Sequence, residues 1–202
     1  MTLLSLLGKL WSRTVWRSEL EMIYAYDPVR QGAGKSDDEV VCCEHYDDIP
    51  AGVAAQLFAS PGSVNFDLMR WRMKQGRARL VYILQDGLLA AYGWIQDWDA
   101  FRRKYRFLAK DGTLLGPYWT RPEFRGRGIY GRLLLHSIHC CQGRKLPILI
   151  AVHPGNDPST RGVEKAGFVK LGTYRLTSAL FGLIWKISCI EHNRDLGDLA
   201  GG

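Results

Sequence analysis

The sequence predicts a single α/β domain in which a mixed sheet is flanked by helices. Apolar and β-branched runs separated by Asp-Gly turns are typical of antiparallel hairpins. After Pro122 the apolar residues recur at helical spacing, and the continuous apolar run over residues 146–152 then suits a buried parallel strand. A length of 202 residues with 47% hydrophobic and 23% charged residues fits one folded domain and argues against intrinsic disorder.

Residues 1–17 are predicted to form a basic amphipathic helix, because leucines recur on one helical arc and no acidic residue is present. This segment lacks the long apolar core and the small-residue cleavage site of a secretory signal. Two interpretations stay open: the helix docks on its own domain, or it lies on an anionic membrane or a partner. We expect the domain to cover residues 18–190 and residues 191–202 to form a flexible tail.

The first half of the domain is predicted to contain strands, two helices and two hairpins. Asp47 or Asp48 is a plausible N-cap for the first of these helices. The predicted elements are strands over residues 18–26 and 39–43, helices over 48–58 and 65–74, a hairpin of 79–84 with 88–98, and a hairpin of 105–108 with 113–120.

The second half is predicted to alternate helices and strands. The predicted elements are a helix over residues 128–141, the parallel strand over 146–152, a helix over 158–165, and strands over 168–175 and 179–187. No apolar run approaches the roughly 20 residues that a membrane-spanning helix needs.

The charge and cysteine content restrict the partners and the compartment. A net charge of +7 predicts an anionic partner, which leaves nucleic acid, an acidic membrane or a phosphorylated ligand open. The five cysteines include two adjacent pairs, which suit neither a disulfide framework nor a zinc site, so we expect reduced thiols in a cytoplasm. His136 and His139 lie near one of these pairs, and we expect no metal there.

The most informative segment lies between the predicted strand at 113–120 and the next helix. It contains Arg125, Gly126, Arg127, Gly128, Ile129 and Tyr130. Glycines let the backbone approach a ligand, and the amides that open the helix attract phosphate. The loop lacks the lysine followed by Ser or Thr of nucleoside triphosphate sites, and its glycine spacing differs from that of dinucleotide sites.

A second segment combines Asn156 and Ser159 with Ala166, Gly167 and Phe168. With this segment and the glycine loop, the chain resembles the GNAT acyltransferase superfamily. The signature of that superfamily is R/Q-x-x-G-x-G/A after the fourth strand. After the fifth strand it has an Asn, then an Ala or Ser, and then Gly-Phe. The resemblance covers roughly residues 115–168. It implies the GNAT fold, in which the fourth and fifth core strands of the mixed sheet splay apart around the cofactor. The local run Arg-Gly-Arg-Gly-Ile-Tyr is similar to acyltransferases of polysaccharide and amino-sugar pathways.

The resemblance implies that acetyl-CoA is the acyl donor. The backbone amides of residues 125–130 would hold its pyrophosphate, and the main chain of Tyr118, Trp119 and Thr120 would pair with its pantetheine arm. Asn156 and Ser159 correspond to polar positions that meet the pantetheine or the acyl end. Tyr130 stands where the family usually has Gly or Ala.

His153 is our candidate general base, because imidazole titrates near neutral pH and the residue directly follows the buried strand. Tyr118 and Asp97 are alternative bases, and Asn156 is a candidate to assist the transfer. The tyrosine that many relatives use to protonate the departing thiolate is Val163 here. The general acid is therefore not identified.

These features predict an N-acyltransferase that moves an acyl group, most simply acetyl, from acyl-CoA to an amine. The expected acceptor is an amino sugar on a nucleotide or lipid carrier, with protein N-termini and small amines as further candidates. The first rival is a noncatalytic acyl-CoA-binding regulatory module. A second rival uses the basic helices to bind RNA, but we do not expect a nucleic-acid partner.

Overall fold

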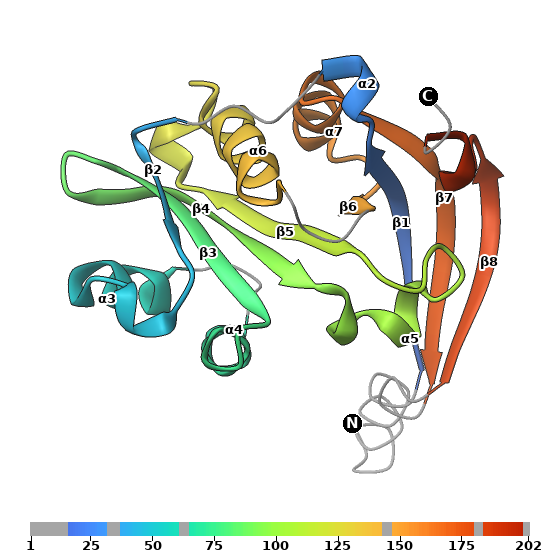
Figure 1. The fold of residues 1–202 in the computed structure, drawn as a ribbon, viewed down its shortest axis with the longest axis horizontal. Helices are drawn as coiled ribbons and strands as arrows, with labels where there is room; N and C mark the ends of the chain where they lie inside the picture. Colours follow the sequence, from blue (N-terminus) through green and yellow to red (C-terminus); the bar gives the residue numbers. More distant parts are fainter. Residues whose placement is uncertain (1–15, 32–36, 61–64, 143–146, 180–183, 200–202) are drawn as a thin grey trace, which may run out of the picture.

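The computed structural model describes residues 16–31, 37–60, 65–142, 147–179 and 184–199, which share one eight-stranded sheet (Figure 1). Its strands are β1 (Trp16–Tyr26), β2 (Val40–Cys43), β3 (Ala78–Gln85), β4 (Leu88–Asp97), β5 (Thr113–Thr120), β6 (Ile148–Val152), β7 (Phe168–Ala179) and β8 (Ile184–His192). The helices are α2 (Pro28–Gln31), α3 (Ala51–Ala59), α4 (Phe66–Lys74), α5 (Arg102–Tyr105), α6 (Ile129–Cys140) and α7 (Asp157–Lys165).

The sheet is mixed, as predicted. Its strand order is β2-β3-β4-β5-β6-β1-β7-β8, and β5 and β6 form its parallel pair, whereas the other described neighbours are antiparallel. The hairpin between β3 and β4 closes through Asp86 and Gly87, which both have positive φ. This backbone conformation is that of the two-residue turn that an Asp-Gly pair predicts.

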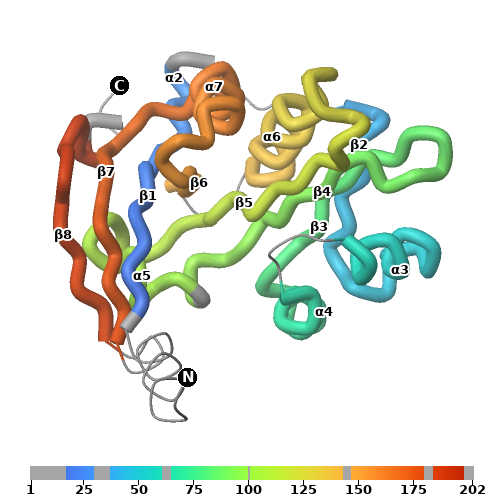
Figure 2. The backbone as a smooth tube through the Cα atoms, turned by 180° about the vertical axis from the view of Figure 1, so that it is seen from behind, coloured from blue at the N-terminus to red at the C-terminus, as the bar shows by residue number. Residues whose placement is uncertain are grey.

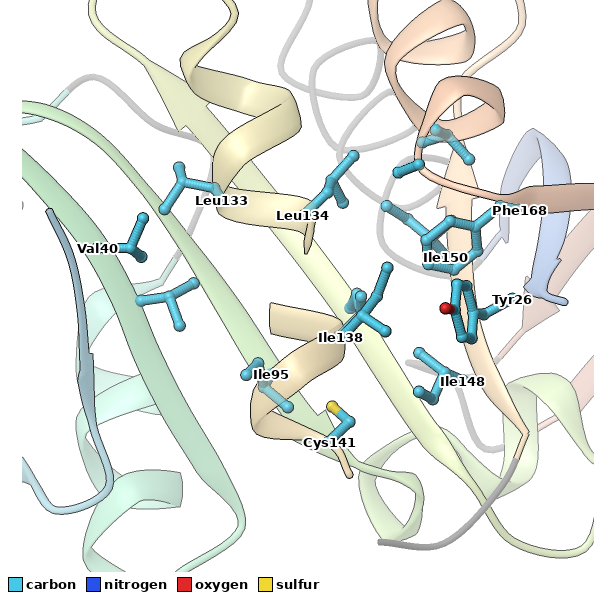
Figure 3. Close-up of a cluster of buried hydrophobic side chains, with 14 of the residues drawn as sticks. Tyr26, Val40, Ile95, Leu133, Leu134, Ile138, Cys141, Ile148, Ile150 and Phe168 are labelled. Atoms are coloured by element: carbon cyan, nitrogen blue, oxygen red, sulfur yellow. The ribbon is translucent and has the colours of Figure 1, made fainter. Parts of the chain in front are cut away.

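Helices cover both faces of the sheet. On one face lie α6 and α7, and on the other lie α3 and α4, as the two opposite views show (Figures 1 and 2). Leu133, Leu134 and Ile138 of α6 point into a cluster that reaches from Val40 on one side to Phe168 on the other (Figure 3). A second cluster packs α3 and α4 against β3 and β4. These two layers fix α6, and with it the loop that precedes α6, over the middle of the sheet.

The amino-terminal strand β1 lies inside the sheet, between β6 and β7. Trp16 pairs with Ala179 and Arg17 with Ser178, so the last two residues of the helix expected over residues 1–17 belong to a strand instead. The ladder with β7 explains this difference, because it satisfies their backbone hydrogen-bonding groups. Residues 1–15, on which the rest of that prediction depends, lie outside the described residues.

Three predicted elements were wrong in part. No strand forms over residues 105–108, because Tyr105 ends α5 and its hydroxyl donates to Glu21 at 2.7 Å. The first predicted helix begins only after Pro50, while Asp48 accepts from the His45 amide at 3.1 Å. The expected tail begins inside a strand, since β8 extends to His192, and the Asn193 amide donates to the Leu171 carbonyl.

An ion pair ties the first turn of α6 to the segment that precedes β2. The Arg132 guanidinium donates to both carboxylate oxygens of Asp37, at 2.6 and 2.8 Å. These hydrogen bonds from Arg132 lower the pKa of Asp37. The Asp37 side chain keeps 23% of its surface exposed, so solvent weakens the pair.

We expect Asp37→Asn to reduce the free energy of unfolding by about 1 kcal/mol at neutral pH. Because the folded-state pKa of Asp37 is lowered, its contribution is present above the ordinary aspartate pKa of about 4 and is lost as pH falls through the folded value. Urea unfolding measures the difference in unfolding free energy between the wild type and Asp37→Asn. Asp38→Asn, a change at an exposed neighbour, is the control. Equal stability of the wild type and Asp37→Asn at neutral pH would contradict it.

Candidate functional site

The glycine loop joins β5 to α6 and is held to the end of β5 and to β4. The Arg121 amide donates to the Ala90 carbonyl of β4 at 2.9 Å, and Arg125 Nε donates to the Thr120 carbonyl at 3.1 Å. Gly126 and Gly128 have φ values of 75° and 74°, a region that favours glycine. Gly128 is the N-cap of α6. Both glycines are exposed, and a Cβ built on either would have no neighbour within 4 Å.

The loop has the properties of an anion site. Among the described residues, no backbone acceptor binds the amides of residues 126–131, and the first helical turn leaves its amides without intrahelical partners. The helix dipole adds partial positive charge at the same place. Arg125 and Arg127 are exposed beside these amides, and the Arg127 guanidinium lies 5.2 Å from the Phe124 ring centroid. Free amides and nearby cations suit a phosphate or pyrophosphate.

The parallel strands β5 and β6 separate directly below this loop. Their ladder runs from Thr113 with Ile148 to Leu115 with Ile150 and extends no further among the described residues. Beyond Leu115, the strand β5 stays paired with β4 on its other side, where Tyr118, Trp119 and Thr120 face Gly93, Tyr92 and Ala91. The edge of β5 toward β6 is therefore open over these three residues. An extended ligand can pair with such an edge as an added strand.

Two tyrosines pack together beneath the loop. The Tyr118 and Tyr130 rings meet edge to face with centroids 5.5 Å apart. The Tyr118 hydroxyl donates to Ser137 Oγ on α6 at 2.8 Å, and its ring lies so close to Gly93 that a Cβ there would be 2.1 Å away. Burial raises the pKa of Tyr118 well above its usual value. At neutral pH its hydroxyl is therefore uncharged, and its proton is donated to Ser137 in this hydrogen bond.

Tyr130 connects the two helices that flank the open edge. Its ring fills the space beside Gly162 of α7, where a Cβ would lie 2.6 Å from the ring. Its hydroxyl hydrogen-bonds the Ser159 side chain, and burial raises its pKa. The large side chain at this position is therefore matched by a glycine on α7. The sequence pattern did not reveal this pairing of Tyr130 with Gly162, nor those of Tyr118 with Gly93 and Ser137, because the partners are distant in the chain.

His153 and Asn156 lie in the turn between β6 and α7, and both are exposed. His153 Nδ1 lies 2.6 Å from the Pro154 carbonyl. A carbonyl can only accept, so Nδ1 carries the proton and Nε2 of the neutral ring presents its lone pair. A general base that acts through Nε2 needs this tautomer, because Nε2 must be unprotonated to accept a proton.

Asn156 is the N-cap of α7, and its side-chain oxygen accepts from the Ser159 amide at 3.3 Å. Asn156→Ala should therefore reduce the free energy of unfolding by about 1 kcal/mol, whereas Asn156→Asp, which keeps a capping oxygen, should not. Thermal unfolding of both variants measures the cap. Calorimetry with CoA on the same variants measures any separate role in ligand binding. An unchanged melting temperature in Asn156→Ala would contradict the capping role.

The structure brings together some candidates and separates others. Residues 118–120, the loop 125–130, the turn that contains His153 and Asn156, and the first turn of α7 with Ser159 surround the separated ends of β5 and β6. Asp97 pairs with Thr113 and so lies at the opposite end of β5, away from the open edge. Val163 is completely buried in the cluster under α6. No described group of three or more His, Cys, Asp and Glu residues could hold a metal ion.

Helices of the described chain are all too short or too polar to cross a membrane.

A sequence model of the acetyltransferase (GNAT) family matches residues 44–168. A search of curated proteins returned no match.

The fold is similar to that of several solved structures. A GNAT-family protein from Novosphingobium aromaticivorans has a TM-score of 0.55 and 20% identity, covering 80% of this chain and 63% of that one. An acetyltransferase of the GNAT family from Colwellia psychrerythraea has a TM-score of 0.53 and 15% identity, covering 93% of this chain and 61% of that one. A GCN5-related N-acetyltransferase-like protein from Streptococcus suis has a TM-score of 0.51 and 13% identity, covering 87% of this chain and 67% of that one. The chain thus spans about three fifths of the length of the first two.

Proposed function

Because this chain belongs to the acetyltransferase (GNAT) family, we propose that it transfers an acetyl group from acetyl-CoA to an amine. The observation that carries the proposal is the loop of free amides at the start of α6, directly beside the open edge of β5. The loop suits the pyrophosphate, and the main chain of residues 118–120 suits the amides of the pantetheine arm.

The donor fits the residues present. Gly126 and Gly128 leave open space on the side where a Cβ would stand, so a phosphate can approach the amides. Arg125 and Arg127 add positive charge at the rim. Acetyl-CoA supplies the acyl group as a thioester, and the chain positions it against the acceptor amine.

We assign the base to His153, whose Nε2 can accept a proton from the ammonium group of the acceptor, so that the resulting amine attacks the thioester carbonyl. Burial keeps the Tyr118 hydroxyl protonated, and its bond to Ser137 makes it a poorer candidate than His153. With Val163 in place of a tyrosine, the leaving thiolate has no identified acid. A thiol has an ordinary pKa of about 8.5, so it can leave without full protonation.

For the acceptor we propose the amine of an amino sugar carried by a nucleotide or a lipid. The net charge of +7 favours an anionic carrier. Trp119, half-buried on β5 and 5.6 Å from the Tyr92 ring, offers an aromatic surface of the kind that can contact a sugar ring. This surface lies on the opposite face of the sheet from Tyr118.

The test is an assay with isotope-labelled acetyl-CoA and a panel of nucleotide-linked amino sugars, small amines and peptides. Mass spectrometry should find one labelled acetyl group on an amino sugar. Transfer to peptides alone would replace the proposed acceptor class. Tight CoA binding without transfer to any amine would instead favour the noncatalytic binding module, for which the buried Val163 is the supporting observation.

A further inference from the structure

Two cysteines that are distant in the sequence meet where β2 crosses the end of α6. Cys42 lies on β2 and Cys140 is the last residue of α6. Their thiols hydrogen-bond each other, and both pack at the margin of the cluster under α6 while remaining partly exposed. All five cysteines are free thiols in the structure. The two thiols are thus neighbours, and both residues are exposed enough to be reached by a small molecule.

A buried arginine lies beside this pair. Arg79 of β3 is only 5% exposed, and its Nη1 donates to the Cys140 carbonyl at 2.9 Å and to Glu44 Oε1 at 3.4 Å. Its Nη2 is buried and has no hydrogen-bond partner among the described residues. Leaving a buried N–H donor of a cation without a hydrogen-bond partner costs free energy. An anion that lies next to this donor is therefore stabilised.

The surroundings distinguish the two thiols. The hydrogen bond from Cys42 lowers the pKa of Cys140, and the positive charge of Arg79 acts in the same direction, while burial and the charges of Cys141 and Glu44 oppose them. The hydrogen bond to Cys140 raises the pKa of Cys42, as does its own burial, and these effects outweigh the charge of Arg79, which lowers the pKa of both thiols. Cys140 therefore loses its proton more readily than Cys42, and Cys42 is the proton donor. The thiolate is the reactive form of a cysteine.

We propose that Cys140 and Cys42 form a peroxide-reactive dithiol site that closes to a disulfide. The Cys140 thiolate attacks one oxygen of a hydroperoxide, so that an S–O bond forms, the O–O bond breaks, and the leaving oxygen takes up a proton. Cys42 then loses its proton, and its sulfur attacks the Cys140 sulfur. An S–S bond forms, the S–O bond breaks, and the hydroxide takes that proton to leave as water.

The other cysteines lack this arrangement. Cys43 is buried on the opposite face of β2, where its thiol contacts the Asp48 carbonyl at 3.8 Å. Cys141 is buried. Cys189 is exposed on β8, at the far side of the sheet, and therefore serves as an internal reference for an ordinary accessible thiol.

The experiment treats the reduced full-length chain with hydrogen peroxide, blocks the remaining thiols with a maleimide at successive times, and maps the peptides by mass spectrometry. We expect a linked peptide pair containing Cys42 and Cys140, with loss of two hydrogen atoms. The reaction should be about tenfold or more faster than oxidation of Cys189, because its nucleophile is a stabilised thiolate. Oxidation of the pair no faster than that of Cys189, or linkage of Cys140 to Cys141 instead, would overturn the proposal.

Two variants separate the roles of the sulfurs. In Cys42→Ser, a sulfenic acid should accumulate on Cys140 and be trapped by a cyclic 1,3-diketone, because the second thiol is missing. In Cys140→Ser, Cys42 should oxidise slowly, and Cys189→Ser should behave as the wild type. Trapping on Cys42 rather than on Cys140 would reverse the roles and contradict the assignment. The wild-type peptide map needs no variant, so it decides the proposal even where a substitution impairs folding.

Discussion

Replacing Gly128 with valine should weaken CoA binding about tenfold or more, because a β-branched residue at a φ of 74° carries a strain of about 1–3 kcal/mol that is relieved by moving the loop. The amides of the first turn of α6 would then lose their alignment with the pyrophosphate. The new side chain would also occupy the open space from which a phosphate approaches. Calorimetric titration of the variant with CoA measures the effect.

Gly131→Ala is the matched control for this variant. Gly131 lies in the same helical turn, has ordinary helical φ, and a Cβ built on it meets nothing within 4 Å. Alanine should therefore leave CoA affinity unchanged and stabilise the helix by up to about 1 kcal/mol. If Gly128→Val bound CoA as tightly as Gly131→Ala while both remained folded, the phosphate would lie elsewhere.

Local chemistry explains which parts of the fold could be predicted from the sequence. The Asp86-Gly87 turn requires positive φ at two consecutive positions, and few other residue pairs tolerate that conformation. Asn65 caps α4 by accepting from the Leu68 amide at 3.1 Å, as a residue of its type does before a helical run. Each of these signals is contained in a few adjacent residues.

Long-range pairing explains what could not be predicted. β1 lies between β6 and β7, and its pairing of Tyr26 with Phe168 joins residues that are far apart in the chain. Hydrophobic periodicity indicates a strand but does not choose its neighbours. The same limit explains the error at residues 105–108, where an apolar aromatic run resembles a strand until the contact of Tyr105 with Glu21 favours a helix end.

The candidate site divides in the same way. The glycine loop was identified because glycine spacing and the start of a helix are local features. The environment of Tyr130 was not, because the ring depends on Gly162 and Ser159 of another helix. Asn156 was expected to serve the ligand, and the structure adds a helix-capping role that the sequence analysis did not predict.

His153→Gln should lower turnover by about a hundredfold to ten-thousandfold at neutral pH, the usual range for loss of a general base. The expectation rests on position and tautomer. His153 directly follows β6, where β5 and β6 have separated, and its Nδ1 is engaged by the Pro154 carbonyl, so that Nε2 is the free acceptor. Glutamine retains a polar side chain but cannot take up the proton of the acceptor ammonium group.

The pH profile tests this role separately from substrate positioning. Wild-type turnover should rise with pH, because only the deprotonated form of a general base accepts a proton, and the variant should lose this rise. CoA affinity should stay unchanged, and His192→Gln, an exposed histidine on β8, should keep both the rate and the profile. If His153→Gln keeps the wild-type rate and profile, the ring serves only its contact with Pro154. The proton would then pass to Tyr118, which would first have to give up its hydrogen bond to Ser137, or to an ordered water, because Asp97 lies at the opposite end of β5.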